Sequence, residues 1–514
     1  MGGSNNTGRT ASGPHDLHNY VAHPISPGPL LALTCVGAAE DLRLPAMLRV
    51  AGHFRTTLCI YFCLLVMVSL SGVDSSPQTP HQTLHGRFTS FEEARETLEQ
   101  YQGSGLAGSS ISIESEWNRW IRAQDVEVRL RIDRGVEDSI SNFILYGVSF
   151  TKLPRLSGSE DVLDEHDSIS GPARARVHAL VVTLEHTTRN GRIEFTREFL
   201  SKQKIPAADF DNYLAGNLVR FAREQRAYQR TLDEASKSPD TNEVMSVRGN
   251  LYKERGLSAD TSLLPNFAVE ETLSAMSNKG VLKPGSIRRI AIVGPGLDFA
   301  DKRDGYDFYP LQTIQPFAVV ETTKRLGLAA SGPVEVVTFD LNAAVNAHVA
   351  RLASRGSKGQ PYTIQLPRDT RAGWSDGAID YWKQFGEILG TPVKPLPVPN
   401  ALPSLESRAV SIGPEYAARM MPLDLNIVAQ TIDATDGDGF DLVVATNILV
   451  YYDLFQQALA MSNIAHMMAP GGIFLANNAL PAAHDPRLKF LGHKQVVFAK
   501  DGSYGDDVFV YQRQ

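Results

Sequence analysis

A short apolar run that ends on Gly-Pro-Gly constrains the fold of this chain more than any other feature. Ile290–Val293 are apolar in succession, as in a strand that is buried on both faces of a parallel sheet, and Gly294-Pro295-Gly296 follows at once. Glycine permits the sharp backbone turn that is needed where such a strand leads into a helix. The pattern therefore predicts the first strand of an α/β domain, followed by a turn that a ligand can approach closely.

A second apolar run, Val334–Phe339, ends on Asp340. A carboxylate at the carboxyl end of the second strand can accept hydrogen bonds from both hydroxyls of a ribose, while Gly294 and Gly296 let the ligand approach the first turn. These two segments together predict a site for an adenosine-bearing ligand. The alternative for Asp340 is a purely structural role as the N-cap of a helix that starts at Ala343.

Two later segments indicate which ligand this is. Phe440–Ala445 is a strand-like run that ends on polar residues, and after a helix Pro470-Gly471-Gly472 leads into a further run, Ile473–Ala476. This order resembles that of the class I S-adenosylmethionine-dependent methyltransferases, and TNILVYYD after the first run is most similar to the chemotaxis-receptor and small-molecule members. The last residues, HKQVVFAKDGSYGDDVFVYQR, resemble the antiparallel hairpin that closes this family's sheet. The resemblance covers the chain from about residue 266 to its end.

The resemblance implies S-adenosylmethionine as the cofactor and methyl transfer to oxygen or nitrogen of an unidentified acceptor. It implies cofactor contacts at Gly294, Gly296, Asp340, Leu341, Asp424, Leu425 and Asn447. Asn447, Tyr451 and Tyr309 are the candidate catalytic residues, because the first two follow the fourth strand and the third lies in a long loop above the same sheet edge. We expect the loop at residues 298–310 and the segment at residues 447–453 to face each other across the methyl-transfer site.

Some of these residues have other interpretations. Asp424 can be a solvated acid of a loop, and Tyr309 can pack an ordinary loop with its aromatic ring. Ile292 stands where the family usually carries an acidic residue, and Asp298 stands where it carries a third glycine. These departures leave open an exported, non-catalytic binding protein that retains the fold. A nucleotide-dependent oxidoreductase is the other alternative, and the missing third glycine disfavours it.

The start of the 514-residue chain differs in composition from the rest. Residues 1–46 lack periodicity and are rich in small and polar residues, which predicts disorder or a wrongly assigned start. Residues 47–75 carry two arginines, an apolar run and then small residues, the order of a secretory signal peptide if translation begins at Met47. Residues 56–73 carry no charge and are also long enough for a membrane anchor. The protein is thus expected to be exported or membrane-anchored if this leader is real, and cytoplasmic otherwise.

Residues 84–240 mix helix and strand patterns. Phe91–Tyr101 and Asp209–Ala235 have the periodicity of helices, whereas Val126–Ile132 alternates as a half-buried strand does. We therefore expect an α/β protein: a Rossmann-like doubly wound sheet with a C-terminal antiparallel hairpin at residues 260–514, preceded by an α+β accessory domain. Residues 360–408 are expected to be an insertion in the sheet domain. Trp374, Tyr381 and Trp382 either form a lid over a substrate or anchor this insertion.

Asp260 and Asn266 lie before the sheet domain, where a family helix flanks the cofactor. They are candidate cofactor contacts or, more simply, a turn residue and the cap of a helix that starts at Phe267.

Composition disfavours a nucleic-acid substrate and sites built from cysteine. The chain has 50 basic and 57 acidic residues, and its net charge of −7 offers no electrostatic footprint for nucleic acid. The acceptor is therefore expected to be a small molecule or a protein. All three cysteines precede residue 64, so a disulfide or a cysteine metal site is not expected in the folded part, and no metal is predicted.

Overall fold

A computed structural model describes residues 84–514 except 103, 105–107, 109, 187–189, 236–254, 301–305, 401, 434–438, 478–479 and 481–484. Gly86–Gln514 belong to one compact unit. The predicted disordered start at residues 1–46 and the predicted leader at residues 47–75 lie outside the described residues. Of the helices that the structure describes, none combines the length and the apolar character that crossing a bilayer requires.

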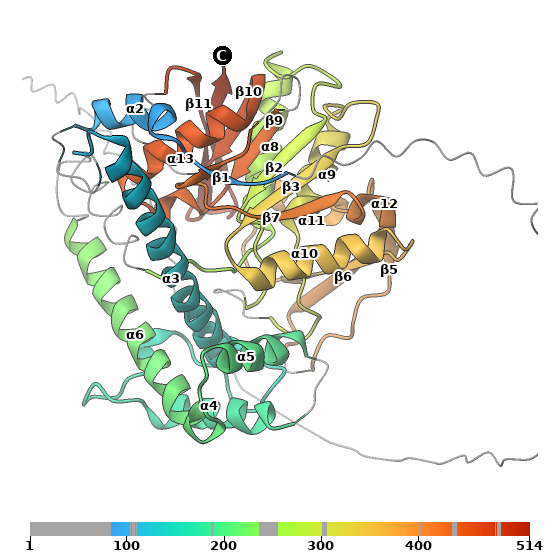
Figure 1. The fold of residues 1–514 in the computed structure, drawn as a ribbon. Helices are drawn as coiled ribbons and strands as arrows, with labels where there is room; N and C mark the ends of the chain where they lie inside the picture. The colour runs from blue at the N-terminus through green and yellow to red at the C-terminus, as the bar shows by residue number, and fades with distance from the viewer. Residues whose placement is uncertain are drawn as a thin grey trace, which may run out of the picture. The chain divides into compact units, whose positions relative to one another are not determined.

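A seven-stranded sheet forms the centre of the C-terminal half of the described residues (Figure 1). Its strands, in spatial order, are β11 (Leu488–Val497), β12 (Gly505–Arg513), β10 (Met468–Ala476), β9 (Phe440–Ala445), β2 (Arg289–Val293), β3 (Glu335–Asp340) and β7 (Met420–Asp424). The five strands from β10 to β7 pair in parallel, and β12 and β11 pair antiparallel. The predicted α/β sheet with a C-terminal antiparallel hairpin is confirmed.

Helices cover both faces of this sheet because its central strands are apolar throughout. Ile290 and Ile292 of β2 are fully buried, in one hydrophobic core with residues of α8 (Leu264–Asn278), α9 (Gln315–Arg325) and α10 (Ala343–Gly356). Helix α13 (Leu454–Met467) packs against β10 and begins with a capping box between Asp453 and Gln456. The strand order reverses at β2, because β3 lies on one side of it and β9 on the other. In an open α/β sheet this reversal opens a crevice at the carboxyl ends of the strands.

The insertion after β3 forms a second, antiparallel sheet. This sheet has the order β4 (Tyr362–Asp369), β6 (Leu405–Ile412), β5 (Gly390–Val393) and carries helix α11 (Asp376–Gln384), with α12 (Pro414–Ala417) leading on to β7. Trp374, Tyr381 and Trp382 are at most 9% exposed and belong to the main hydrophobic core. These aromatic residues therefore anchor the insertion.

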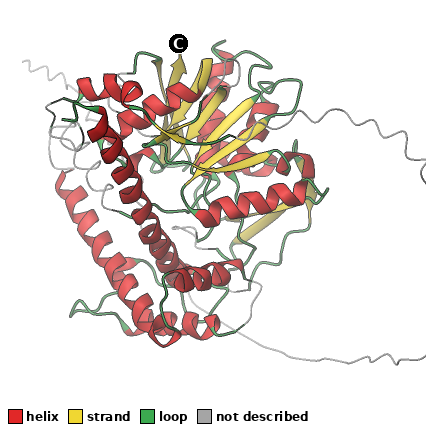
Figure 2. Cartoon of the chain, in the orientation of Figure 1, coloured by secondary structure: helices red, strands yellow, loops and turns green. Residues whose placement is uncertain are grey.

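The segment before the sheet is drawn almost entirely as helices and loops (Figure 2). Its helices are α2 (Phe91–Gln100), α3 (Glu114–Tyr146), α4 (Gly171–Leu184), α5 (Gly191–Lys202) and α6 (Phe210–Ala235). Its two-residue strand β1 (Arg87–Phe88) pairs with β8 (Gln430–Thr431) of the sheet half. The helices predicted from Phe91 and from Asp209 are confirmed, and residues 114–235 are called the helical segment below.

The strand predicted at Val126–Ile132 is wrong, because these residues lie in the middle of α3. The buried positions of this helix include Ile121, Val128 and Ile132, which follow the helical spacing. The other two apolar residues of the alternation, Val126 and Leu130, are 58% and 69% exposed. An α+β character of this segment is therefore not confirmed in its described residues.

The helix start predicted at Phe267 is also wrong. Helix α8 begins at Leu264 with Pro265 in its first turn, a position that proline favours because its fixed φ suits a helix start. Asn266 consequently lies inside the helix, is 1% exposed and donates to the Ser262 carbonyl (3.0 Å) instead of capping.

Candidate functional site

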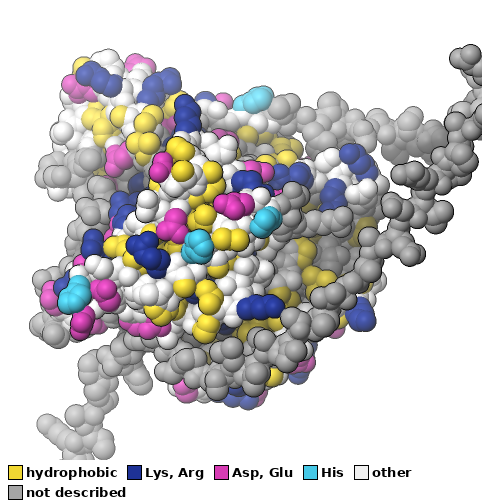
Figure 3. All heavy atoms as spheres, turned by 90° about the horizontal axis from the view of Figure 1, so that it is seen from below, with side chains coloured by type: hydrophobic (Ala, Val, Ile, Leu, Met, Phe, Trp, Pro, Cys, Tyr) yellow, Lys and Arg dark blue, Asp and Glu magenta, His cyan; other side chains and the backbone are white. Residues whose placement is uncertain are grey.

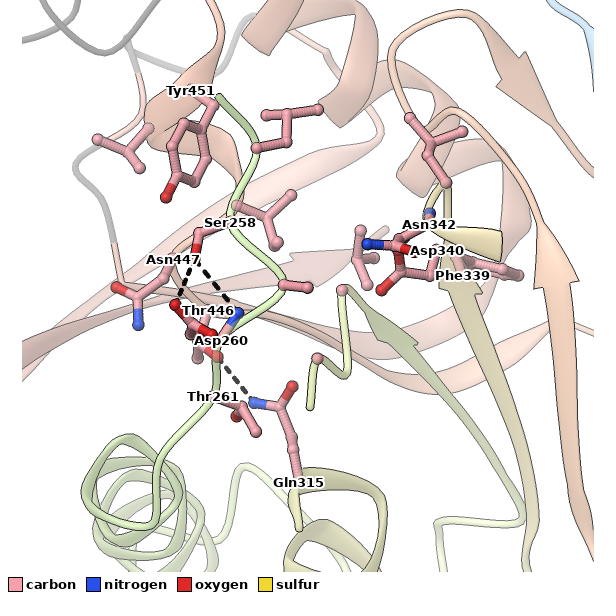
Figure 4. A pocket seen from close by; sticks show the side chains of 18 of the residues that line it. Ser258, Asp260, Thr261, Gln315, Phe339, Asp340, Asn342, Thr446, Asn447 and Tyr451 are labelled. Atoms are coloured by element: carbon pink, nitrogen blue, oxygen red, sulfur yellow. Dashed lines mark hydrogen bonds between the residues drawn. The ribbon is translucent and has the colours of Figure 1, made fainter. Parts of the chain in front are cut away.

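A cavity of about 310 Å³ lies at the carboxyl ends of β2, β3 and β9, where the strand order reverses. Ligands bind at this position in open α/β sheets. Figure 4 shows Asp340 and Asn342 on one side of the cavity and a group of polar side chains on the other. The lining residues with polar side chains are Ser258, Asp260, Thr261, Ser262, Gln315, Asp340, Asn342, Thr446, Asn447, Tyr451, Tyr452 and Tyr504.

The glycine turn lines this cavity, and only glycine fits the backbone conformation and the space at residues 294 and 296. Gly294 and Gly296 have φ of 67° and 62°, which side chains rarely tolerate. A Cβ on Gly294 would lie 2.2 Å from Cδ1 of Ile448, and a Cβ on Gly296 would lie 2.7 Å from the Ala259 carbonyl oxygen. The Gly294 N–H donates to the Phe339 carbonyl (2.8 Å), which ties the turn to β3.

A connecting segment, residues 255–262, runs along the glycine turn and brings further polar groups to the cavity. The Leu297 N–H donates to the Ala259 carbonyl (2.6 Å), and the Thr261 N–H donates to the Leu297 carbonyl (3.0 Å). The Ser258 hydroxyl donates to Oδ2 of Asp260 (3.1 Å), as Figure 4 shows. These main-chain hydrogen bonds with the turn fix the backbone that carries the Ser258 hydroxyl and the Asp260 carboxylate.

Asp340 ends β3 and is partly buried at the cavity wall. Its Oδ1 accepts from the Asn342 N–H (2.7 Å), while the Asn342 side chain caps α10 through the Ala344 N–H (3.0 Å). The N-cap is therefore Asn342 and not Asp340. Burial raises the pKa of Asp340 to about 7, although hydrogen bonds from the backbone N–H groups of Asn342, Leu341 and Gly296 lower it. This carboxyl group consequently changes charge near neutral pH.

Across the cavity from Asp340, the end of β9 carries a strained residue. Asn447 has a φ of 59°, which costs free energy in a residue other than glycine. Its N–H donates to Oδ1 of Asn477 (2.7 Å), and Nδ2 of Asn477 donates in return to Oδ1 of Asn447 (2.7 Å). The residue before Asn447 is Thr446, whose hydroxyl accepts a hydrogen bond from Nε2 of Gln315 (2.7 Å). The polar end of β9 is thus held from two sides.

Helix α3 completes the wall near Tyr451, which ends the short 3-10 helix η3 (Leu449–Tyr451). Nη2 of Arg131 donates to the Tyr451 carbonyl (2.8 Å), Nε of Arg131 donates to the Arg255 carbonyl (3.0 Å), and the Arg131 carbonyl accepts from the Leu257 N–H (3.0 Å). Ile132, the next residue of α3, lines the cavity. The helical segment is therefore part of the site.

The structure brings together most of the residues predicted to bind the cofactor or act in catalysis. The lining residues among them are Gly294, Gly296, Asp340, Leu341, Leu425, Asn447 and Tyr451. The possible contact Asp260 lines the cavity too, whereas Asn266 does not. Figure 4 shows Asn447 and Tyr451 on the same side of the cavity, opposite Asp340.

Two predicted residues lie elsewhere. The Asp424 carboxylate is not among the lining groups and forms an ion pair with Arg129 of α3 (2.8 Å). Tyr309 is 5% exposed, donates its hydroxyl to Oδ2 of Asp298 (2.9 Å) and lies under the guanidinium of Arg192. The 298–310 loop therefore does not bring the Tyr309 ring into the cavity.

Several lining residues were not predicted from the sequence. Ser258, Thr261 and Gln315 are polar residues in segments without a motif, and Thr446 begins the TNILVYYD stretch. Ile132 comes from a helix whose short pattern also fits a strand. Thr446 follows directly after a predicted strand, so its position was the available signal. Among the described residues, no group of three or more His, Cys, Asp or Glu side chains is arranged to hold a metal ion.

Comparison with solved structures finds methyltransferases at low identity. An N-methyltransferase, NodS from Bradyrhizobium japonicum WM9 in complex with S-adenosyl-L-homocysteine, matches with a TM-score of 0.24 and 12% identity over 49% of this chain and 88% of that chain. Magnesium protoporphyrin IX methyltransferase from Synechocystis PCC 6803 with bound SAM matches with a TM-score of 0.23 and 8% identity over 52% of this chain and 97% of that chain. No protein-family model and no curated protein sequence matches.

The strand order itself identifies the fold of the C-terminal half. A central β2 is flanked by β3 and β7 on one side and by β9 and β10 on the other, and an antiparallel strand pair closes the sheet beyond β10. This is a doubly wound α/β sheet closed by an antiparallel strand pair, the arrangement that the resemblance of the sequence motifs implies.

Proposed function

We propose that this protein binds S-adenosylmethionine in the cavity beside Gly296 and transfers its methyl group to an oxygen or nitrogen acceptor. One observation carries the proposal: two glycines with positive φ and the carboxyl group of Asp340 line one cavity at the reversal of the sheet. The family resemblance of the motif residues and the doubly wound sheet support the same cofactor.

In this proposal Asp340 accepts hydrogen bonds from the ribose hydroxyls, for which a charged acceptor gives stronger bonds than a neutral one. Leu341 and Leu425 offer apolar contacts to the adenine, and the glycine turn leaves space for the amino-acid part. Asp424 does not serve the adenine while Arg129 occupies its carboxylate.

When bound, S-adenosylmethionine supplies a methyl group on a sulfonium sulfur. An acceptor atom could then attack the methyl carbon in line, with the electron pair of the carbon–sulfur bond passing to sulfur and the acceptor's proton to water. Asn447 and Tyr451 would orient the acceptor, because they lie across the cavity from Asp340. Neither an amide nor a phenol is a strong base, so alignment of the acceptor is the main contribution of these two side chains.

The acceptor is proposed to be a small molecule or a protein rather than a nucleic acid. Figure 3 shows basic and acidic side chains interspersed with apolar ones on the face seen from below, without dominance of either sign. Together with a net charge of −7, this distribution does not favour a phosphate backbone.

Calorimetric titration of the full chain with S-adenosylhomocysteine tests cofactor binding, with NAD⁺ as the comparison ligand. Saturable binding of S-adenosylhomocysteine alone supports the proposal, whereas binding of NAD⁺ alone would favour the oxidoreductase alternative. Transfer of radioactive methyl from labelled S-adenosylmethionine to a panel of small amines, phenols and peptides then separates an enzyme from a binding protein. Absence of binding to either ligand would refute the cofactor assignment.

A further inference from the structure

The loop that follows the glycine turn is held by a buried arginine of the helical segment. Arg192 of α5 is 0% exposed, and it donates to four main-chain carbonyls of the 298–310 loop. Nη2 donates to Asp298 (2.8 Å), Nε donates to Phe299, and Nη1 donates to Asp307 (3.2 Å) and Tyr309 (2.5 Å). One guanidinium thus joins both ends of this loop, and the Asp298 carbonyl lies two residues after Gly296.

A side chain of the loop also accepts hydrogen bonds from the helical segment. The Asp307 carboxylate accepts from the N–H groups of Val148 and Ser149 (2.9 and 3.0 Å) and from the Ser149 hydroxyl (2.5 Å). Phe299 is 1% exposed and belongs to the hydrophobic core of the helical segment. The described ends of the loop, residues 298–300 and 306–310, are therefore packed against the helical segment, and the first of them directly follows the turn at Gly296.

We propose that Arg192 is a positioning residue for the glycine turn, so that the packing of the helical segment sets the affinity of the cavity for its ligand. This inference rests on the proposed function for the identity of the ligand. Without the guanidinium, four buried carbonyls lose a donor, and the loop end next to Gly296 is free to shift. Lysine cannot replace it, because an ammonium group lacks the planar fork that reaches both ends of the loop.

The chain contains a matched control for this residue. Arg176 of α4 is 1% exposed and also donates to four main-chain carbonyls, and its guanidinium also lies over an aromatic ring, that of Phe150 at 5.2 Å. All four of its acceptors, Ile144, Gly147, Leu153 and Pro154, belong to the helical segment itself. Arg176→Met and Arg192→Met thus remove the same kind of buried bonds, but only Arg192→Met releases the loop.

The test compares the two variants of the full chain by thermal unfolding and by titration with S-adenosylhomocysteine. Both are expected to unfold at lower temperature than the wild type. Below that temperature Arg192→Met should weaken binding by about tenfold, within the usual range of coupling between separate sites, while Arg176→Met should stay within about twofold. Equal losses of affinity in both variants, or none in Arg192→Met, would overturn the inference.

Hydrogen exchange on the wild type provides a second measurement in case Arg192→Met does not fold. Because coupling is reciprocal, S-adenosylhomocysteine should slow exchange at the Val148 and Ser149 amides, which bond to Asp307 outside the cavity. Unchanged exchange there, with binding confirmed by calorimetry, contradicts the coupling.

If the wild type binds no S-adenosylhomocysteine, the proposed function fails. The positioning role of Arg192 is then tested by hydrogen exchange in the ligand-free variants. Exchange at the Leu297 and Asp298 amides should then be faster in Arg192→Met than in Arg176→Met, and equal rates would refute it.

Discussion

Replacing Asp340 by asparagine separates its role in ligand binding from its role in the fold. Asparagine has nearly the same shape, and its Oδ1 can still accept from the Asn342 N–H, a bond of 2.7 Å in the structure. The variant removes the negative charge that the ribose hydroxyls would meet and turns one acceptor oxygen into an N–H donor, next to the backbone N–H groups of Leu341 and Gly296. Losing a charged acceptor costs about 1.5 to 3 kcal/mol. Affinity for S-adenosylhomocysteine should therefore fall roughly 10- to 150-fold at pH 8.

The pH dependence gives this prediction a second, independent signature. Burial raises the pKa of Asp340 to about 7, so the free protein holds a proton there at acidic pH. If ligand binding needs the carboxylate, the affinity of the wild type should decrease below pH 7, by at most about tenfold for each pH unit. The affinity of Asp340→Asn should not change over the same interval.

The stability of the ligand-free protein should change in the opposite sense. The folded-state pKa of about 7 lies above the ordinary value of 3.8, so the folded state binds this proton more tightly than the unfolded state. The resulting stabilisation is fully present below about pH 4 and is lost as the pH rises through 7, with a slope of at most about 1.4 kcal/mol for each pH unit. Asp340→Asn has no carboxyl group at this position, so its free energy of unfolding should not decrease in this way. The difference in free energy of unfolding, variant minus wild type, should therefore increase from pH 4 to pH 7.

Calorimetry and thermal unfolding between pH 5 and pH 8 measure both effects. Glu335→Gln is the matched control, because Glu335 starts the same strand, is about half exposed and only pairs with Arg289 (3.2 Å). The control should bind like the wild type at every pH. An Asp340→Asn protein that binds normally but melts well below the wild type would show that Asp340 is a structural residue.

Three further variants test other parts of the site. Gly296→Ala should abolish measurable ligand binding and destabilise the fold by about 1 to 3 kcal/mol. Gly471→Ala, at a position with a similar φ of 79° but open space around it, should still bind the ligand. Calorimetry measures the binding, and thermal unfolding measures the stability. Tyr309→Phe should lower the melting temperature without changing ligand affinity, while Tyr451→Phe should lower the rate of methyl transfer and leave the melting temperature nearly unchanged. The reverse pattern would show that Tyr309, and not Tyr451, acts in the site. Gly135→Ala should separate α3 from the connecting segment, because its Cβ would lie 1.8 Å from a backbone oxygen there, and faster hydrogen exchange at residues 255–262 would show this.

The sequence predicts the centre of the fold well because that part is determined locally. A strand that is buried on both faces must be apolar throughout, and a turn with positive φ and no room for a Cβ must be glycine. Ile290–Val293, Gly294, Gly296 and Asp340 satisfy these requirements within about fifty residues, and the structure places them together. The order of the segments then determines the topology of the parallel strands.

The same reasoning fails where a short pattern fits two kinds of structure. Val126–Ile132 alternates like a strand, but its residues also fit a long helix whose buried face continues from Ile121 to Val136. A window of seven residues cannot separate the two periods, while a window of thirty can. Missing this helix also removed Ile132 and Arg131 from the predicted site.

Arginines account for the remaining differences between the expected and the observed site. In the sequence Arg129, Arg131 and Arg192 have the appearance of ordinary surface charges, since nothing local indicates their partners. In the structure they bind the Asp424 carboxylate, the Tyr451 carbonyl and the carbonyls of the 298–310 loop. Each contact joins the helical segment either to the last residue of a strand of the parallel sheet, as at Asp424, or to a segment that follows a strand.

These contacts explain why Asp424 and Tyr309 lie outside the cavity although the sheet is as predicted. The parallel sheet places the loops at one edge, but the helical segment determines which side chains of those loops turn inward. Asp424 is held outward by Arg129, and the Tyr309 ring is held under Arg192. Since a guanidinium reaches several acceptors at once, we expect substitutions at these arginines in α3 and α5 to change which of the two side chains reach the cavity. The lining of the cavity therefore depends on residues of the helical segment as well as on the strands.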